Sequence, residues 1–214
     1  NAKFYIQEQN VYAGLGNKIS AIFAKSVFSS FEDTKNISKK KLNYTGPIVN
    51  TTLTRSDISL FEKQTIGFMG GSQGSKQINN YVDKFMETEY QLNFNIVHVT
   101  GKNNDKLEIN SKNYRSVDFI EEMDEFYREI DILVGRAGGG SLEAAYLGIP
   151  QILIPYKHGT TSSHQVLNAR YLEQKGFGFT VNSFEELINN IKNISENIKY
   201  KNFNMKNIPI GNFI

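Results

Sequence analysis

The sequence has no cysteine and only three histidines in its 214 residues. Without thiols it can form no disulfide bond, thiolate metal site or cysteine nucleophile. His98 falls inside the apolar segment 94–100, where a histidine buried in the core is more common than a catalytic one. His158 and His164 have mainly hydroxyl-bearing neighbours, so the sequence predicts no metal site.

Several other signatures are also missing. No apolar run approaches the roughly 18 residues of a membrane-spanning helix, and no signal peptide is visible, so we expect a soluble cytoplasmic protein. The 24 basic and 22 acidic residues nearly balance, which gives no support for nucleic-acid binding. No Asp-x-Asp pair follows a predicted strand, and neither a Gly-x-Ser-x-Gly elbow nor a Walker-type phosphate loop occurs. An initiating Met is missing too, so we expect an excised piece of a longer protein.

The strongest local signal lies in residues 131–156, which predict a buried strand, a glycine-rich turn, a short helix and a second buried strand. Gly138, Gly139 and Gly140 stand where the strand passes into the helix, and the bare backbone at a helix start favours an anion. Glu143 lies just inside that helix and suits two ribose hydroxyls better than a phosphate. The pattern predicts a nucleotide diphosphate site, although glycines and acidic residues also begin helices that bind nothing.

A second glycine-rich turn, 70–74, follows the apolar segment 65–69 and precedes a predicted helix over 75–86. Ser72 offers a hydroxyl and Gln73 an amide at the phosphate-facing end of this turn. From here on, strands and helices alternate, which predicts an α/β fold with a Rossmann-like parallel sheet covered by helices on both faces. Both turns would then lie at the carboxyl edge of one sheet, where such folds bind ligands.

Further groups are candidates for the same site. Arg136 is the best single cation for a phosphate, and it could equally be a structural residue that pairs across the turn. The loop 155–163 and the helix start after it carry neutral groups that suit sugar hydroxyls, or they form a solvated loop that caps the helix 165–175. These neutral groups belong to Thr160, Thr161, Ser162, Ser163, His164 and Gln165.

The ends of the chain are simpler. Residues 1–50 predict strands around a helix over 16–25, and 51–62 look like a connector. Ser183 and Glu186 form a capping box that begins the last helix. The buried stripe of that helix consists of Leu187, Ile191, Ile194 and Ile198.

Five blocks occur in an order that resembles the MurG-type transferases, and the resemblance covers nearly the whole chain. The blocks are Gln7-Glu8-Gln9-Asn10, Gly70 to Gly74, Phe119 to Met123, Arg136 to Glu143, and His164-Gln165-x-x-Asn168-Ala169. Enzymes of this family add N-acetylglucosamine from UDP-GlcNAc to the lipid-linked muramyl-pentapeptide of peptidoglycan. The resemblance therefore implies a glycosyltransferase of cell-wall synthesis that inverts the anomeric carbon and needs no cofactor.

The resemblance also implies a GT-B fold, in which two Rossmann-like domains face each other across a cleft. Residues 1–50 would be the last part of the N-terminal, acceptor-side domain, and 51–214 the C-terminal domain that binds the UDP-sugar. Ser72 would contact the phosphates, the Ile120 backbone the uracil and Glu143 the ribose. The full implied set is Asn10, Gly71, Ser72, Gln73, Ile120, Arg136, Gly138, Gly139, Gly140, Ser141, Glu143, His164, Gln165 and Asn168, of which Gln165, Asn168 and Asn10 would hold the sugar.

The catalytic base and the membrane-facing patch of the family would precede Lys3, so we expect this chain to bind the donor without transferring it. The whole protein would act on a lipid-linked acceptor at the inner face of the cell membrane. The chain departs from the family in three places. Gln7 replaces a histidine, Asn50 replaces the family's phosphate-facing arginine, for which Arg55 is a candidate substitute, and the Arg136–Glu143 spacing is one residue shorter.

Three alternatives remain open at this point. The chain could belong to another GT-B transferase that acts on a glycolipid or polysaccharide precursor, with the acceptor half as a separate subunit. It could be related to the UDP-GlcNAc 2-epimerases, which share the fold and need no acceptor. It could also be a nucleotide-sugar-binding module without activity, an alternative that Asn50 favours.

Overall fold

The computed structural model describes residues 2–50, 52–54, 63–102, 104, 107–156 and 162–199, without the side chains of 162, 163 and 199. The expectations for Arg55, for most of the 51–62 connector, for His158 and for the hydroxyls of 160–163 lie outside this description.

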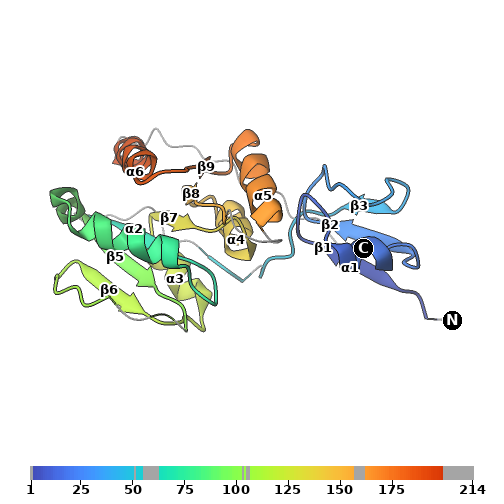
Figure 1. Cartoon of the computed structure of the whole chain (residues 1–214), viewed down its shortest axis with the longest axis horizontal. Helices are drawn as coiled ribbons and strands as arrows, with labels where there is room; N and C mark the ends of the chain where they lie inside the picture. The colour runs from blue at the N-terminus through green and yellow to red at the C-terminus, as the bar shows by residue number, and fades with distance from the viewer. Residues whose placement is uncertain are drawn as a thin grey trace.

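The N-terminal part of the chain forms a three-stranded parallel sheet with the order β1-β2-β3. It lies at one end of the molecule, beside α5 (Figure 1). The elements of this part are β1 (Tyr5–Glu8), α1 (Leu15–Ser20), β2 (Ser26–Ser29) and β3 (Leu42–Tyr44).

Helix α1 is shorter than the predicted helix over 16–25. Beyond Ser20 the backbone tightens, because the amides of Ile22 and Phe23 bond to carbonyls only three residues back. The ammonium of Lys41 donates to the carbonyl oxygens of Ala21 and Ile22 at 2.8 and 2.7 Å. These carbonyls are thereby satisfied without a continued helix.

The larger sheet has six strands, all parallel, in the order β6-β5-β4-β7-β8-β9. The predicted parallel sheet with alternating helices is thus confirmed (Figure 1). Its strands are β4 (Gln64–Met69), β5 (Phe94–Val99), β6 (Tyr114–Val117), β7 (Ile132–Gly135), β8 (Gln151–Leu153) and β9 (Phe179–Thr180). The connections are α2 (Lys76–Met86), a 3-10 helix (Glu89–Asn93), α3 (Met123–Glu129), α4 (Gly139–Leu147) and α5 (Ser162–Gln174), and α6 (Phe184–Lys199) follows β9.

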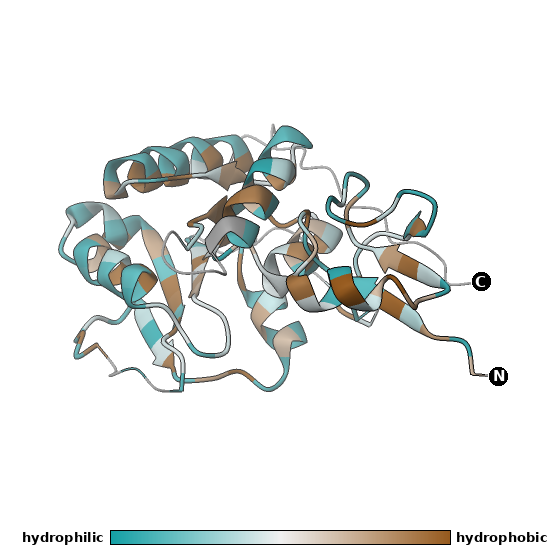
Figure 2. Cartoon of the chain, turned by 45° about the vertical axis from the view of Figure 1, so that its right-hand side comes forward, coloured by the Kyte–Doolittle hydropathy of each residue, from teal (hydrophilic) through white to brown (hydrophobic). Residues whose placement is uncertain are grey.

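Helices cover both faces of this sheet. On one face α2 packs through Ile78, Val82 and Phe85, and α6 through the four predicted residues of its apolar stripe. On the other face α3 and α4 pack against the core through Phe126, Tyr127 and other residues. In Figure 2 the hydrophobic residues of α6 lie on its sheet-facing side. Burial of these apolar faces is what holds the helices on the sheet.

The start of α6 follows the predicted capping box with one difference. The Ser183 hydroxyl accepts from the Glu186 amide at 3.1 Å, as expected. The Glu186 carboxylate, however, accepts from the amide of Asn182 at 2.7 Å, one residue before the predicted partner. Two amides at the helix start are still satisfied reciprocally.

The two sheets are joined by a shared apolar cluster. Val11 and Phe31 from the N-terminal part pack with Leu142 of α4 and Tyr171 of α5. The rings of Phe31 and Tyr171 meet edge to face, with centroids 4.9 Å apart. The proposed boundary at residue 50 falls between the two sheets and remains a prediction.

Candidate functional site

The two predicted turns meet at the centre of the six-stranded sheet. Strands β4 and β7 are hydrogen-bonded neighbours, but β4 leads on to β5 on one side, whereas β7 leads on to β8 on the other. Such a reversal of strand order opens a crevice at the carboxyl ends of the two strands, and open α/β folds bind ligands there. The turns 70–75 and 136–138 follow β4 and β7 and therefore flank this crevice.

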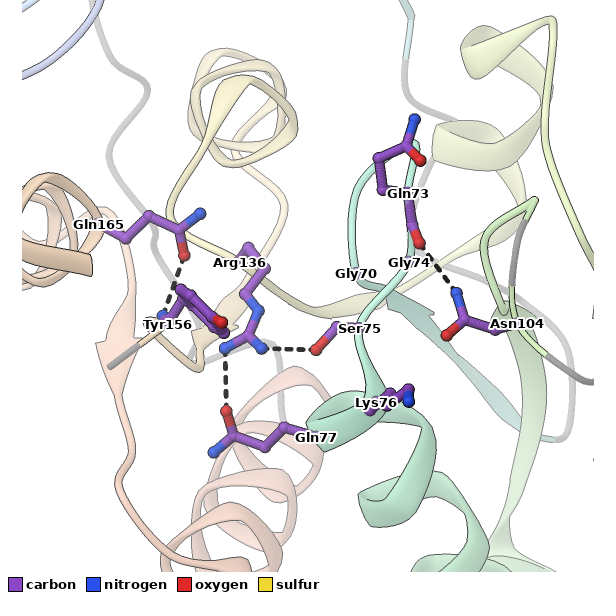
Figure 3. A pocket seen from close by; sticks show the side chains of 10 residues that line it. All are labelled: Gly70, Gln73, Gly74, Ser75, Lys76, Gln77, Asn104, Arg136, Tyr156 and Gln165. Carbon is purple, nitrogen blue, oxygen red and sulfur yellow. Dashed lines mark hydrogen bonds between the residues drawn. The ribbon is translucent and has the colours of Figure 1, made fainter. Parts of the chain in front are cut away.

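The turn after β4 is held by its neighbours. Gly74 has φ of +71°, and a Cβ there would lie 2.1 Å from the Thr100 carbonyl oxygen. Asn104 donates to the carbonyl of Gln73 at 2.8 Å (Figure 3). Ser75 caps α2 by accepting from the Ile78 amide at 3.3 Å. The turn is therefore fixed, and it leaves the predicted ligands Ser72 and Gln73 on the surface, with Gly71 partly exposed.

Arg136 cross-links the two sides of the crevice. Its guanidinium donates to Ser75 Oγ at 2.6 Å and to Gln77 Oε1 at 3.0 Å (Figure 3). It also donates to the Ile154 carbonyl at 2.7 Å. Partial burial lowers the pKa of Arg136 from its usual value. The structural role considered for Arg136 is thus present. The side chain also lines the cavity described next, so a role as cation is compatible with it.

A cavity of about 740 Å³ opens beside Arg136. Among the described residues that line it, Arg136 and Lys76 are cationic and no residue is acidic. The N-terminus of α2, an 11-residue helix, adds its positive dipole end on the same side. The cavity suits an anion and the neutral groups attached to it. Its other lining residues include Gly70, Gln73, Asn104 and Gln165.

The turn after β7 begins α4 as predicted. Gly138 is the extended N-cap residue, and Gly139 lies exposed at the first helical position. Ser141 is almost fully buried, and its hydroxyl donates to the carbonyl of Gly138 at 2.6 Å. This bond holds the turn from within. The backbone of Gly139 is therefore more accessible to a ligand than the Ser141 side chain.

Glu143 lies one turn into α4 and is partly buried. Its Oε2 accepts a hydrogen bond from the hydroxyl of Tyr127 on α3 at 2.6 Å. Ile120, the predicted uracil contact, lies between β6 and α3 and packs against the hydrophobic cluster that contains Tyr127. The base, ribose and phosphate contacts predicted from sequence thus come from neighbouring segments at one edge of the sheet.

The predicted sugar contacts lie on α5. Gln165 lines the cavity, and its Oε1 accepts from the Tyr156 amide at 3.0 Å (Figure 3). His164 donates through Nδ1 to the carbonyl of Tyr12 at 2.7 Å. This bond ties α5 to the N-terminal part of the chain.

Asn168, by contrast, is buried, and both its side-chain oxygen and its side-chain nitrogen make hydrogen bonds. Its Nδ2 donates to Asn10 Oδ1 at 3.1 Å and to the Ala137 carbonyl at 3.2 Å, and its Oδ1 accepts from the Val11 amide at 2.9 Å. Asn168 therefore joins the N-terminal loop to the glycine turn. A sugar contact from Asn168, which remains a prediction, would have to use the second lone pair of Oδ1 or replace one of these bonds.

Sequence reasoning missed two functional neighbours. Glu8 is 1% exposed, and its carboxylate accepts from the Asn10 amide and side chain and from Gly14 and Asn17, so it folds the loop that presents Asn10. Its place beside Asn10 in the family block was the available signal. Tyr127 was missed because its partner Glu143 is 16 residues away on another helix.

His98 is fully buried, as predicted, and bonds to Tyr114 and Asn79 at 2.9 and 3.0 Å. Among the described residues, no group of three or more His, Cys, Asp or Glu side chains could hold a metal ion. No helix in the described part of the chain is both long and apolar enough to span a membrane.

The family model and the similar sequences all point to glycosyltransferases. The sequence model of the glycosyltransferase family 28 C-terminal domain matches residues 65–213. A UDP-N-acetylglucosamine–N-acetylmuramyl-(pentapeptide) pyrophosphoryl-undecaprenol N-acetylglucosamine transferase from Thermosipho melanesiensis is 34% identical over 189 residues, which are 87% of this chain and 54% of that protein. The transferase of the same name from Staphylococcus saprophyticus is 34% identical over 188 residues, or 82% of this chain and 52% of that protein. The chain thus spans about half the length of these relatives.

Solved structures share the fold. The crystal structure of MurG from Acinetobacter baumannii superposes with a TM-score of 0.66 at 21% identity, over 96% of this chain and 64% of that one. A UDP-GlcNAc 2-epimerase from Neisseria meningitidis, bound to UDP-GlcNAc, superposes with a TM-score of 0.54 at 15% identity, over 89% of this chain and 58% of that one. At these identities the likeness shows the fold alone, which is the Rossmann-like C-terminal domain of the GT-B type.

Proposed function

The chain belongs to the family of glycosyltransferase family 28 C-terminal domains, and we propose that it is the donor-binding portion of an inverting glycosyltransferase. The donor is UDP-GlcNAc. The whole protein transfers N-acetylglucosamine to a lipid-linked acceptor of cell-wall synthesis at the inner face of the membrane. The names of relatives at 34% identity support this donor and acceptor.

The observation that carries the proposal is the crevice between β4 and β7. A phosphate-sized anion is favoured there by the start of α4 at Gly139, by the exposed Ser72 and by the cations Arg136 and Lys76. Glu143 supplies a carboxylate at the same edge, and carboxylates accept from vicinal hydroxyls. One uridine diphosphate would use all of these groups at once.

Each group has a distinct role in this proposal. The turns at 70–74 and 138–141 bind the diphosphate and stabilise the charge that develops on UDP as it leaves. Ile120 reads the base and Glu143 holds the ribose. Gln165, in the cavity beside Arg136, would hold the sugar together with Asn168 and Asn10. No metal is required, because backbone amides and the two cations neutralise the phosphates.

The N-terminal part is proposed to be a piece of the acceptor-side domain. Its helix α1 and the turn after it expose apolar side chains, with Leu15 at 71%, Ile22 at 68% and Phe23 at 79%. Apolar surface of this kind is usually covered by another element or partner. The acceptor half, on the same chain or as a separate subunit, is the proposed cover.

Thermal unfolding with added ligands tests the proposal. Saturation at about 100 times the dissociation constant adds roughly 2.7 kcal/mol of stability, which is a midpoint shift of roughly 5–10 °C for a domain of this size. UDP should raise the midpoint, UDP-GlcNAc should raise it further than UDP-glucose at equal concentration, and Glu143→Ala should reduce both shifts by about half or more. No shift with any uridine nucleotide would contradict the proposal.

Turnover separates this proposal from an epimerase. UDP-GlcNAc incubated with the chain alone should be recovered unchanged, since no acceptor is present. Appearance of the 2-epimer would instead assign the chain to the epimerase activity of its structural neighbour. Proton NMR distinguishes unchanged UDP-GlcNAc from its 2-epimer, because the two differ in configuration at C2.

A further inference from the structure

Tyr127 lies against the first turn of α4, with its side chain fully buried. Its hydroxyl oxygen is 2.6 Å from Glu143 Oε2 and 3.3 Å from the carbonyl oxygen of Gly140. The hydroxyl has one proton, and the shorter contact to the charged acceptor takes it. Tyr127 is therefore a donor to the one acidic side chain that α4 carries at this edge of the sheet.

The tyrosine is a rigid donor. Its ring packs in the cluster that includes Leu133, Ala144 and Ile149, so it has little freedom to turn. Burial first, and then the nearby charge of Glu143, raise the pKa of the Tyr127 hydroxyl well above its usual range. The hydroxyl of Tyr127 therefore keeps its proton at neutral pH and can donate it to Glu143.

The side chain of Glu143 has several rotatable bonds, and the hydrogen bond from Tyr127 restrains them. It is only partly buried, and an unrestrained glutamate side chain must lose its rotamer freedom when a ligand binds. A carboxylate has about four lone-pair sites, so one bond from Tyr127 leaves capacity for two ribose hydroxyls. The restraint thus fixes the carboxylate without occupying it.

We propose that Tyr127 is a positioning residue that holds Glu143 ready for both ribose hydroxyls. It thereby makes the site selective for ribonucleoside diphosphates over their 2′-deoxy counterparts. This inference rests on the proposed function, because it requires a uridine diphosphate in the crevice. Tyr127 stands on α3, which begins at Met123, three residues after Ile120. The proposed base contact and the donor to the proposed ribose contact are therefore only seven residues apart in the chain.

Calorimetric titration of the chain with UDP and with 2′-deoxy-UDP tests the inference. The wild-type protein should bind UDP about tenfold or more tightly than 2′-deoxy-UDP, the factor expected for a hydrogen bond to a charged group. In Tyr127→Phe, which removes only the hydroxyl, this ratio should fall below about threefold. Tyr81→Phe is the matched control: Tyr81 is a partly buried tyrosine of α2 on the opposite face of the sheet, and its loss of a hydroxyl should leave the ratio unchanged.

A merely structural tyrosine would give a different result. Tyr127→Phe would then unfold at a lower temperature but keep the wild-type ratio, which would overturn the inference and leave the proposed function intact. Wild-type protein that binds neither nucleotide would overturn both. Glu143→Asp is a second variant for the case that Tyr127→Phe does not fold. It keeps the charge but withdraws the carboxylate from Tyr127, so it should also lose the ratio, and a retained ratio would contradict the inference.

Discussion

The side-chain amide of Asn168 donates a hydrogen bond to the side-chain oxygen of Asn10, 158 residues earlier in the chain. The same amide group bonds to the carbonyl of Ala137 and accepts from the amide of Val11. One buried side chain therefore connects the N-terminal loop, α5 and the glycine turn before α4. The geometry of the crevice depends on this connection, because the turn is one of its two walls.

Asn168→Ala should destabilise the protein by about 2–4 kcal/mol, because it leaves the Val11 amide and the Ala137 carbonyl buried without their partner. Urea unfolding followed by circular dichroism measures the change. Asn80→Ala is the matched control, since Asn80 lies exposed in the interior of α2, and it should change the stability by less than about 0.5 kcal/mol. Equal stability of the two variants would contradict the connecting role.

Two glycines of the site should respond oppositely to alanine. Gly74→Ala should cost about 3 kcal/mol or more, because the added Cβ would lie 2.1 Å from the Thr100 carbonyl oxygen at a φ of +71°. Gly139→Ala should leave stability unchanged, since its Cβ would have no atom within 4 Å. It should nevertheless weaken UDP binding, because the methyl group would stand between the start of α4 and the phosphate. Unchanged UDP affinity in Gly139→Ala would contradict the proposed backbone approach.

Arg136 should contribute to the binding of the phosphates of UDP and not to the binding of its nucleoside. Arg136→Ala should weaken UDP by roughly 10- to 100-fold, which is the range for a charged hydrogen bond, and should leave uridine binding nearly unchanged. Arg115→Ala is a suitable control, because Arg115 is exposed and paired with Glu129 away from the cavity. Calorimetry with the two ligands gives the comparison. A parallel loss of UDP and uridine affinity would assign Arg136 a purely structural role.

Burial of His98 predicts a defined pH dependence. Desolvation lowers the pKa of His98 to about 4 from its usual 6.5. The unfolded state therefore binds more protons between pH 6.5 and 4, so the His98 contribution is complete above pH 6.5 and is lost as the pH falls through this window. The free energy of unfolding should fall by about 3 kcal/mol across this window because of His98. The His98 ring resonances should stay in the neutral position at pH 5 in the native protein, and titration near 6.5 in that state would contradict the prediction.

Local chemistry in the sequence predicted much of the fold. Ile78, Val82 and Phe85 recur at helical spacing, and they are buried as that spacing predicts. The two glycine turns follow apolar strands, so their meeting at one sheet edge followed from parallel pairing alone. The predicted α1 was too long because its end depends on Lys41, about 20 residues further along the chain.

The bonding of the site residues was not predictable in the same way. Sequence patterns identify Arg136, Glu143 and Asn168 as polar residues near the turns. Their partners, however, come from distant segments: Ser75 for Arg136, Tyr127 for Glu143 and Asn10 for Asn168. Only the folded arrangement reveals that Asn168 is engaged in structural bonds, whereas Ser72 and Gly139 are exposed.

Titration of the isotopically labelled protein with UDP, followed by amide NMR, tests the central claim most directly. The account predicts the largest chemical-shift changes in the turns 70–75 and 138–143 and at Ile120, with little change in α6. A second cavity of about 830 Å³ lies between the N-terminal part and α5, lined by Asp33, Lys35 and Arg170 among others. Shifts confined to that cavity, or no shifts at saturating UDP, would contradict a donor site at the carboxyl ends of β4 and β7.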